Sequence, residues 1–389
     1  MAVKFTKPEI NVREKLAELD KPSGLAGEAM LRAETPQEQF NLIGAGRKNL
    51  LYNGAMMINQ RGTQSGITSA RYTLDRWGIG DGTGGVFQVS QSTNVPDGFQ
   101  NAWQFETTTA DTDLSTGTQY VNFYQALEGQ DLKQLAYGTP NAKPITLSFW
   151  VKSSKAGQFA SELEIVGGVN VQPWTVNQED TWEYKTVTFE GNTSTAITTT
   201  TTTGMWVVVC WMAAGDGISG PNFQSGWRSL NQTERLPENI PNMADSTSNI
   251  MRFTGVQLEV GKVATPFEHR SYGEELALCQ RYYQKFYDEA SSTGQIMLMG
   301  LASGTAHFTW WPSVEMRARP TVGITTTTPY WESFPWYVVG TSLTVSSISN
   351  GHLSRSGGEI AVYGSFNPAL VRGTNYSMTG EVIYFDAEL

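Results

Sequence analysis

The strongest constraint on the fold is a series of short runs in which apolar and polar residues alternate, each closed by glycine or another turn-forming residue. Residues 145–154 read ITLSFWVKSS, and every second residue from Ile145 to Val151 is apolar, as in a half-buried strand. The same period recurs over 181–191 and 250–261, and 205–215 form the continuous apolar run of a central strand covered on both faces. No helical pattern separates these runs. They predict a mainly β protein with an antiparallel β-sandwich, and a jelly roll is the favoured version.

Helical signals divide this chain into segments. The predicted segments are an N-terminal arm at 1–47, the jelly roll at 48–271, a connecting helix at 272–287 and a smaller C-terminal all-β module at 288–389. The connecting helix is expected because Ser271 and Glu274 form a capping box. Leu276, Cys279, Tyr283 and Phe286 then follow at spacings of three and four residues.

The N-terminal arm cannot form a core of its own, because its two short helical patterns each carry only one narrow apolar face. It must dock on its own body, on sister chains or on a larger particle. The apolar residues available for this anchoring are Phe5, Val12, Leu16, Leu19, Phe40 and Ile43. The N-terminus lacks the apolar core of a signal peptide, and no run of 18 apolar residues predicts membrane insertion.

Composition excludes one class of partner. The formal net charge is −10 and no basic stripe occurs, so we expect no nucleic-acid partner, because such binding depends on clustered Lys and Arg. The two cysteines, Cys210 and Cys279, have no partner pattern and are expected to be free buried thiols.

Catalytic signatures are missing from the sequence. We find no nucleophile elbow, zincin motif or phosphate-binding loop, and the glycine-rich stretch at 77–85 lacks the strand–helix frame of a dinucleotide site and is expected to be a loop. The carboxylates of Glu162 and Glu164 share one face of a probable strand, where solvated surface is the favoured interpretation. We predict a non-enzyme without a required cofactor. Asp111 and Asp113 are candidates for a structural Ca²⁺ site.

Aromatic residues offer another kind of site. Phe149, Trp206 and Phe253 lie in strand patterns and are expected in the core. Other tryptophans lie in polar, Gly-rich or Pro-rich surroundings, where an indole face can stack on a sugar ring, plug the end of the sandwich or pack between subunits. These glycan-binding candidates are Trp77, Trp103, Trp174, Trp227, Trp331 and Trp336.

Three short motifs follow one another near residue 270. They are GVQLE at 255–259, TPFE with Arg270 at 265–270, and EL, LC and RYY within 275–283. Together they resemble a segment common in tail-fibre and related appendage proteins of tailed bacteriophages. Similar pieces occur in the same order at 49–62, 76–77, 126–132, 145–157, 180–191 and 311–322, whereas the threonine run at 197–203 departs from the pattern.

The resemblance implies a carbohydrate-binding-type jelly roll on a virion, usually trimeric. We therefore expect a homotrimeric tail fibre, located on the virion, anchored to other virion proteins by its arm and attached to host-surface polysaccharide. A head fibre or decoration protein on the capsid is one alternative. A host-polysaccharide depolymerase is another, although such tail spikes usually carry repetitive β-helix rungs, which the sequence lacks.

Overall fold

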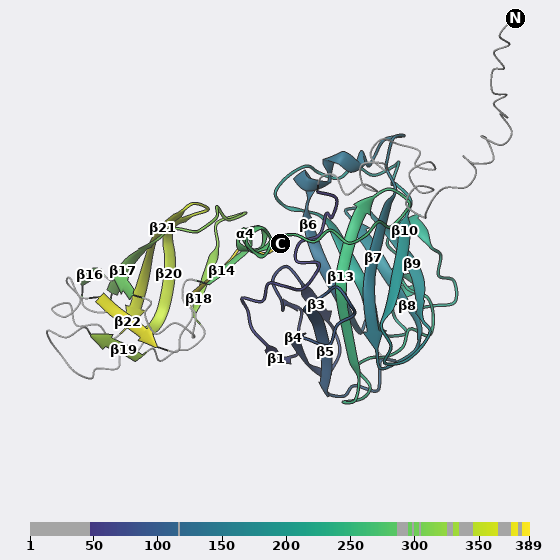
Figure 1. The fold of residues 1–389 in the computed structure, drawn as a ribbon, viewed down its shortest axis with the longest axis horizontal. Coiled ribbons are helices and arrows are strands. Elements are labelled where there is room, and N and C mark those ends of the chain that lie inside the picture. The colour runs from purple at the N-terminus through teal and green to yellow at the C-terminus, as the bar shows by residue number, and fades with distance from the viewer. Residues whose placement is uncertain are drawn as a thin grey trace, which may run out of the picture.

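A sandwich and a smaller C-terminal β module lie side by side and are joined through helix α4 (Tyr272–Gln280) (Figure 1). The computed structural model describes residues 47–115, 117–285, 295–297, 299–302, 305–324, 330–333, 345–364, 375–379 and 383–389. The anchoring predictions for Phe5, Val12, Leu16, Leu19, Phe40 and Ile43 lie outside the described residues.

Two antiparallel sheets form the sandwich, which confirms the predicted fold class. In spatial order, the six-stranded sheet contains β1 (Gln64–Ile67), β4 (Val86–Ser92), β5 (Ala102–Thr109), β13 (Ile250–Val260), β7 (Ile145–Ser153) and β10 (Glu183–Phe189). The seven-stranded sheet contains β12 (Gly226–Arg228), β9 (Gly168–Val176), β8 (Gly157–Ile165), β11 (Thr203–Ala214), β6 (Tyr120–Glu128), β3 (Gly78–Asp81) and β2 (Arg71–Tyr72). Two 3-10 helices, η1 (Gly129–Leu135) and η2 (Gln232–Glu234), lie in its connections.

Aromatic rings from both sheets fill the space between them. Phe123 of β6 packs on Trp103 of β5, with ring centroids 4.1 Å apart, and on Phe253 of β13 at 5.0 Å. Phe149 continues the contact to Phe253 at 5.8 Å. All four side chains are fully buried, as expected for Phe149 and Phe253 from their strand patterns. Large buried rings supply much of the area that stabilises a sandwich.

The connecting helix is shorter than predicted. It begins after Ser271, whose hydroxyl accepts the backbone N–H of Glu274 at 3.4 Å, so Ser271 is confirmed as the N-cap, while the Glu274 carboxylate pairs with Arg47. It ends at Gln280, and Tyr283–Lys285 form strand β14 instead. The aromatic spacing suggested a longer helix, but β14 pairs with β23 near the C-terminus, and this long-range pairing overrides the local pattern.

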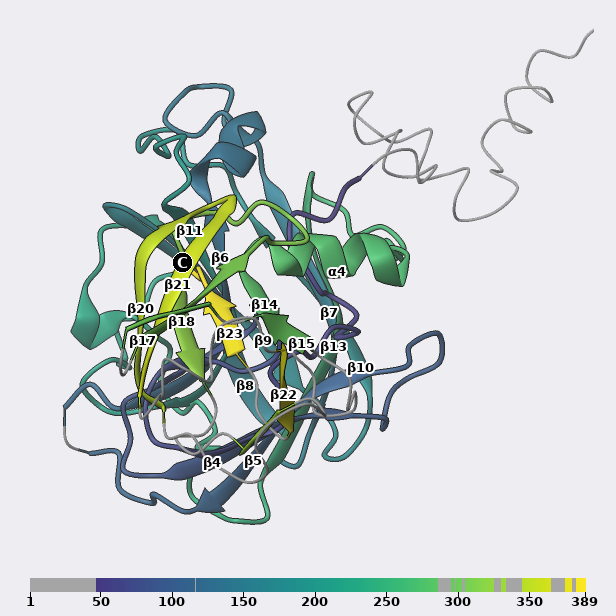
Figure 2. The ribbon, with the colours of Figure 1, turned by 90° about the vertical axis from the view of Figure 1, so that its left-hand side faces the viewer.

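Within its described residues, the C-terminal module contains three small antiparallel sheets. The sheet next to the sandwich contains β14 (Tyr283–Lys285), β23 (Ile383–Asp386) and β18 (Thr321–Ile324). The others contain β15 (Gln295–Met297), β22 (Asn375–Thr379) and β19 (Tyr330–Ser333), and β16 (Met299–Ala302), β17 (Thr305–Trp310), β21 (Gly357–Gly364) and β20 (Val345–Ser354). Figure 2 looks onto this module with the sandwich behind it.

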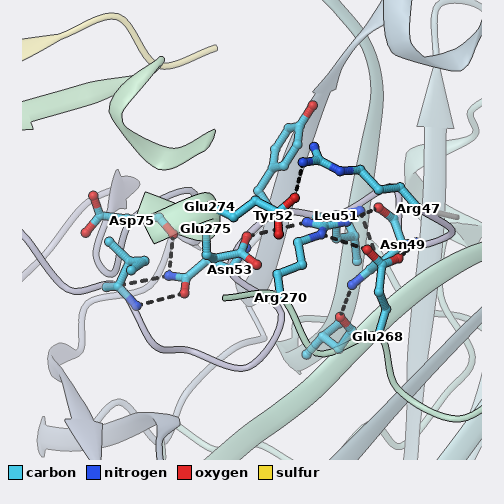
Figure 3. Close-up of polar contacts among 12 residues, drawn as sticks. Arg47, Asn49, Leu51, Tyr52, Asn53, Asp75, Glu268, Arg270, Glu274 and Glu275 are labelled. Atoms are coloured by element: carbon cyan, nitrogen blue, oxygen red, sulfur yellow. Dashed lines mark hydrogen bonds and ion pairs between the residues drawn. The ribbon is translucent and has the colours of Figure 1, made fainter. Parts of the chain in front are cut away.

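A polar seam holds the first described residues against the start of α4 (Figure 3). Glu268 accepts the backbone N–H groups of Lys48 at 2.6 Å and Asn49 at 2.7 Å. Arg270 donates to the carbonyl oxygen of Asn49 at 2.6 Å and to that of Leu51 at 3.1 Å. The TPFE motif therefore has a structural role, because its carboxylate and the following arginine position the chain that enters the sandwich.

Removing the Glu268 carboxylate should loosen this seam. We expect Glu268→Ala to lower the free energy of unfolding by about 1–3 kcal/mol, because two part-buried N–H groups lose their acceptor. Burial alone would raise the pKa of Glu268, but the N–H groups of Asn49 and Lys48 and the nearby Arg270 hold it below its usual value. This contribution should be complete above the unfolded-state pKa of about 4.3 and disappear as the pH falls through the lower folded-state pKa. Denaturant titration at pH 7 and pH 3 checks both statements, and an equal loss at the two pH values would contradict them.

A second joint fixes the C-terminal end to the sandwich. Arg76 is fully buried, and its guanidinium pairs with Glu388 and donates to the carbonyl of Ala126. Its charge lies 3.5 Å from the ring centroid of Tyr282, which follows α4. Arg61 adds ion pairs to Asp386 at 3.1 Å and to Glu388 at 3.2 Å. Two arginines of the sandwich therefore bind two carboxylates at the C-terminal end of the chain, next to the ring of Tyr282.

Candidate functional site

The outer face of the seven-stranded sheet carries two adjoining hollows. One has a volume of about 370 Å³ and lies over β6 and β11, and the other, of about 360 Å³, lies over the β8–β9 turn and the start of β11. Glu164 and Trp206 line both hollows. We call the two together the groove.

Strand alternation explains the first wall of the groove. In β6, Val121 and Phe123 point into the core, so Tyr120, Asn122 and Tyr124 face outward and line the first hollow. Neighbouring β3 presents glycines at this face. A Cβ at Gly80 would lie 2.4 Å from Oδ1 of Asn122, which instead accepts the Gly80 N–H at 3.1 Å. The predicted loop at 77–85 therefore begins with a strand whose small residues leave room for the groove.

Strand β11 supplies the largest apolar surfaces. Trp206 is half-buried and meets Tyr124 edge to face, with ring centroids 5.0 Å apart. Trp211 meets Tyr120 in the same way at 5.4 Å. A strict two-residue period would not place both tryptophans on one face. The pairing of β11 with β6 shifts register between Val208 and Cys210, and this bulge turns Trp211 back toward the groove.

This arrangement corrects one sequence interpretation. Trp206 was expected in the core, but it lies half-buried on the face of β11 that lines the groove. The run 205–215 was expected to be covered on both faces, and residues 207–213 are indeed buried. The indole N–H of Trp211 is buried without a hydrogen-bond partner among the described residues. The alternation of Tyr120, Asn122 and Tyr124 with apolar residues is a sequence signal for the outward face of β6 that lines the groove.

An ion-pair network borders the first hollow and extends to the buried Glu162. Arg235 donates from Nε to Glu162 at 2.9 Å and from Nη2 to Glu164 at 2.5 Å, and Nη2 also pairs with the second oxygen of Glu162. Its guanidinium carbon lies 4.9 Å from the Trp211 ring centroid. Burial raises the pKa of Glu162, although hydrogen bonds from Arg235 act in the opposite direction. The prediction of a solvated acid pair is wrong for Glu162, which is fully buried, while Glu164 retains an exposed fraction of 34%.

Three of the tryptophans proposed to bind sugars lie in the core. Trp77 and Trp103 are fully buried and Trp174 is 7% exposed. Each indole N–H has an internal acceptor, namely the Asn53 carbonyl at 2.8 Å for Trp77, the Thr73 hydroxyl at 3.0 Å for Trp103 and the Ser161 hydroxyl at 2.9 Å for Trp174. These three predictions are wrong, because a ring that is buried on both faces with its N–H satisfied has no surface for a sugar.

The remaining tryptophans have different positions. Trp227 of β12 is half-buried, donates to the Glu190 carbonyl and packs edge-on against Tyr137, with ring centroids 5.6 Å apart. It lies close to the second hollow but does not line it. Trp331 belongs to β19, and Trp336 lies outside the described residues. Of these three, the structure places only the side chain of Trp227, and it does not line the groove.

The two calcium candidates lie in an exposed loop after β5. Asp111 accepts the backbone N–H of Gly84 at 2.8 Å, and Asp113 accepts the N–H of Ser115 at 3.0 Å. Hydrogen bonds from Ser115 lower the pKa of Asp113. Within the described ranges, no group of three or more His, Cys, Asp or Glu residues is placed to hold a metal ion. A calcium site at these two residues stays a prediction.

Comparisons with known proteins give partial similarities in structure. No protein-family model and no curated protein sequence matches the chain. The enzymatically active domain of tailspike protein 4 from bacteriophage CBA120 matches with 10% identity and a TM-score of 0.31, over 55% of this chain and 21% of that one. The xylan-binding domain CBM22-1 of Paenibacillus barcinonensis Xyn10C matches with 12% identity and a TM-score of 0.26, over 57% of this chain and 100% of the domain. The family 11 carbohydrate-binding module of Clostridium thermocellum Lic26A-Cel5E matches with 13% identity and a TM-score of 0.25, over 52% of this chain and 99% of the module.

The groove has the lining and the size of a binding site. The half-buried rings of Tyr120, Tyr124 and Trp206 line it together with the amide of Asn122 and the carboxylate of Glu164, and its volume can hold a few sugar rings. Both thiols are free and buried, as predicted for Cys210 and Cys279, and neither faces this space. Among the helices that the structure describes, none has the length and apolar character needed to cross a membrane.

Proposed function

We propose that this protein is a non-enzymatic glycan-binding structural protein and that the groove is its binding site. The observation that carries the proposal is the joint exposure of Trp206 and Glu164, which line both hollows, next to Tyr124, which lines the first. Aromatic rings offer apolar faces to sugar C–H groups, and carboxylates and amides accept or donate hydrogen bonds to hydroxyls.

The acid pair supports binding rather than hydrolysis. Glycoside hydrolysis uses two carboxyl groups that flank the scissile bond from opposite sides. Glu162 and Glu164 instead lie on one strand and share the guanidinium of Arg235. Release of reducing ends from capsular polysaccharide, abolished by Glu164→Gln, would overturn the non-enzyme proposal.

We propose that this protein is part of a phage virion, where it forms a trimeric tail fibre attached through residues 1–47. The ordered resemblance over 49–322 supports this placement, and the seam around Glu268 and Arg270 would carry load from the arm into the sandwich. Light scattering tests the trimer. Cross-linking of virions from Lys4, Lys7 or Lys21 tests the placement, because links to the major capsid protein would favour the head-fibre alternative.

Truncating the central tryptophan should weaken glycan binding. We expect Trp206→Ala to reduce affinity for the best ligand of a glycan array by about 5- to 150-fold, which corresponds to about 1–3 kcal/mol per stacked ring. Titration calorimetry on the folded full-length chain measures the change.

The matched control is Trp150→Ala. Trp150 is also a half-buried strand tryptophan, but it pairs with Tyr184 on the six-stranded sheet, with ring centroids 5.4 Å apart. We expect its truncation to leave glycan affinity within about twofold. If the array gives no ligand, or if Trp150→Ala abolishes binding while Trp206→Ala does not, the groove is not the binding site.

A further inference from the structure

The charge balance of the groove defines the class of glycan that it can accept. Glu164 and Arg235 are the two charged side chains among the residues that line the hollows. The guanidinium of Arg235 already binds Glu162 through two nitrogens and Glu164 through one of them. Its positive charge is therefore shared between two carboxylates before any ligand arrives.

A further cation, Arg228, adds no positive charge to the surface of the groove. Arg228 acts on Glu162 electrostatically, so the charges of Glu162, Glu164, Arg235 and Arg228 sum to zero. However, Arg228 does not line either hollow, and its guanidinium donates to the backbone carbonyls of Gln224, Glu234 and Arg235 at 2.8–3.2 Å. The groove has no surplus positive charge with which to bind an anionic sugar.

Glu164 is the charged group that a ligand would meet. It belongs to both hollows and is 34% exposed, and only its Oε2 accepts a hydrogen bond from a described residue, Arg235. Its other oxygen can accept hydrogen bonds from the hydroxyl groups of a sugar. A sugar carboxylate in the same place would be a like charge at contact distance in a partly dehydrated site, where repulsion is strong.

We infer that the groove binds an uncharged stretch of glycan and rejects acidic sugars, with Glu164 as the residue that sets this specificity. The inference rests on the proposed glycan function and deepens it. Trp206 supplies an apolar contact where the two hollows meet, and Glu164 beside it accepts hydrogen bonds from sugar hydroxyls. Arg235 binds both Glu164 and the buried Glu162 and so holds the Glu164 carboxylate in place. The positions of Glu164 and Trp206 in both hollows imply that the recognised unit spans the junction between neighbouring sugar rings.

The test uses one pair of probes on the full-length chain. The first probe is the neutral oligosaccharide that binds most tightly in a Trp206-dependent manner, and the second is the same oligosaccharide with one primary alcohol oxidised to the uronate. We expect the unmodified protein to bind the uronate at least about tenfold more weakly. In Glu164→Gln, which keeps an acceptor oxygen but removes the charge, the difference between the two probes should shrink to less than about threefold.

A charge-matched control separates this effect from net charge. Glu179→Gln makes the same change in the exposed turn after β9 and should leave the tenfold preference intact. Thermal melting confirms that each variant is folded. Equal or tighter binding of the uronate by the unmodified protein would overturn the inference, as would an unchanged preference in Glu164→Gln. Both of these outcomes would leave Trp206-dependent binding, and so the proposed function, standing. Failure of every glycan to bind through Trp206 would overturn both.

Discussion

Glu388→Ala should be among the most destabilising single substitutions in this protein, lowering the free energy of unfolding by about 3–5 kcal/mol. The substitution leaves the fully buried Arg76 guanidinium without its carboxylate partner. In the unmodified protein, burial alone lowers the pKa of Arg76, but Glu388 and the surrounding tyrosines raise it overall. Without Glu388 the guanidinium still keeps its proton, because arginine is effectively always protonated in proteins, so the buried charge remains without compensation. Urea titration followed by tryptophan fluorescence measures the change.

An exposed ion pair in the same module provides the control. Glu315 pairs with Arg355 at 3.1 Å, and their side chains are 57% and 45% exposed. Such pairs contribute about 0–1 kcal/mol, so Glu315→Ala should have little effect. Equal losses in the two variants would show that Glu388 does not compensate a buried charge. Faster proteolysis at 283–285 in Glu388→Ala alone would locate the damage at the joint, because β14 pairs with β23, which ends two residues before Glu388.

The sequence predicts the sandwich because each strand has to satisfy a local rule. In β7 and at the end of β10 the apolar core residues recur at every second position, and that period is visible without any tertiary information. The connecting helix shows where such rules end. Its N-cap at Ser271 is local and is predicted correctly, whereas its end is set by the pairing of Tyr283–Lys285 with residues about a hundred positions further along the chain.

The candidate site was harder to predict because it depends on contacts between segments that are far apart in the sequence. Trp77, Trp103 and Trp174 lie in polar local sequence, yet their N–H acceptors, Asn53, Thr73 and Ser161, come from other segments of the fold. The groove depends on a bulge in β11 and on Arg235, which reaches Glu162 across 73 residues of sequence. Neither feature leaves a periodic signal. The resemblance marked the seam motifs, and in the structure these motifs lie at the joint between the two modules, where none of their residues lines the groove.

Arg235→Ala should destabilise the sandwich by about 3–5 kcal/mol at pH 8, because it leaves the Glu162 carboxylate buried and unpaired. Burial already raises the pKa of Glu162, and loss of the arginine removes the hydrogen bonds that oppose this rise. The folded variant then holds a proton more tightly than the unfolded chain, so its stability falls as the pH rises from the unfolded-state pKa of about 4.3 to the higher folded-state pKa. The loss relative to the unmodified protein should therefore be smallest near pH 4 and largest at pH 8.

Two further variants show whether the unpaired charge is the cause. Combining Arg235→Met with Glu162→Leu removes both charges and keeps the buried volume, so it should cost less stability than Arg235→Ala alone. Lys262→Ala breaks the exposed pair with Glu190, whose side chains are 58% and 70% exposed, and should cost at most about 1 kcal/mol at every pH. If the double variant is as unstable as Arg235→Ala, the arginine acts through its packing on Trp211 rather than through Glu162. Glycan affinity should then fall in both variants, because the same contact holds the groove wall formed by β11.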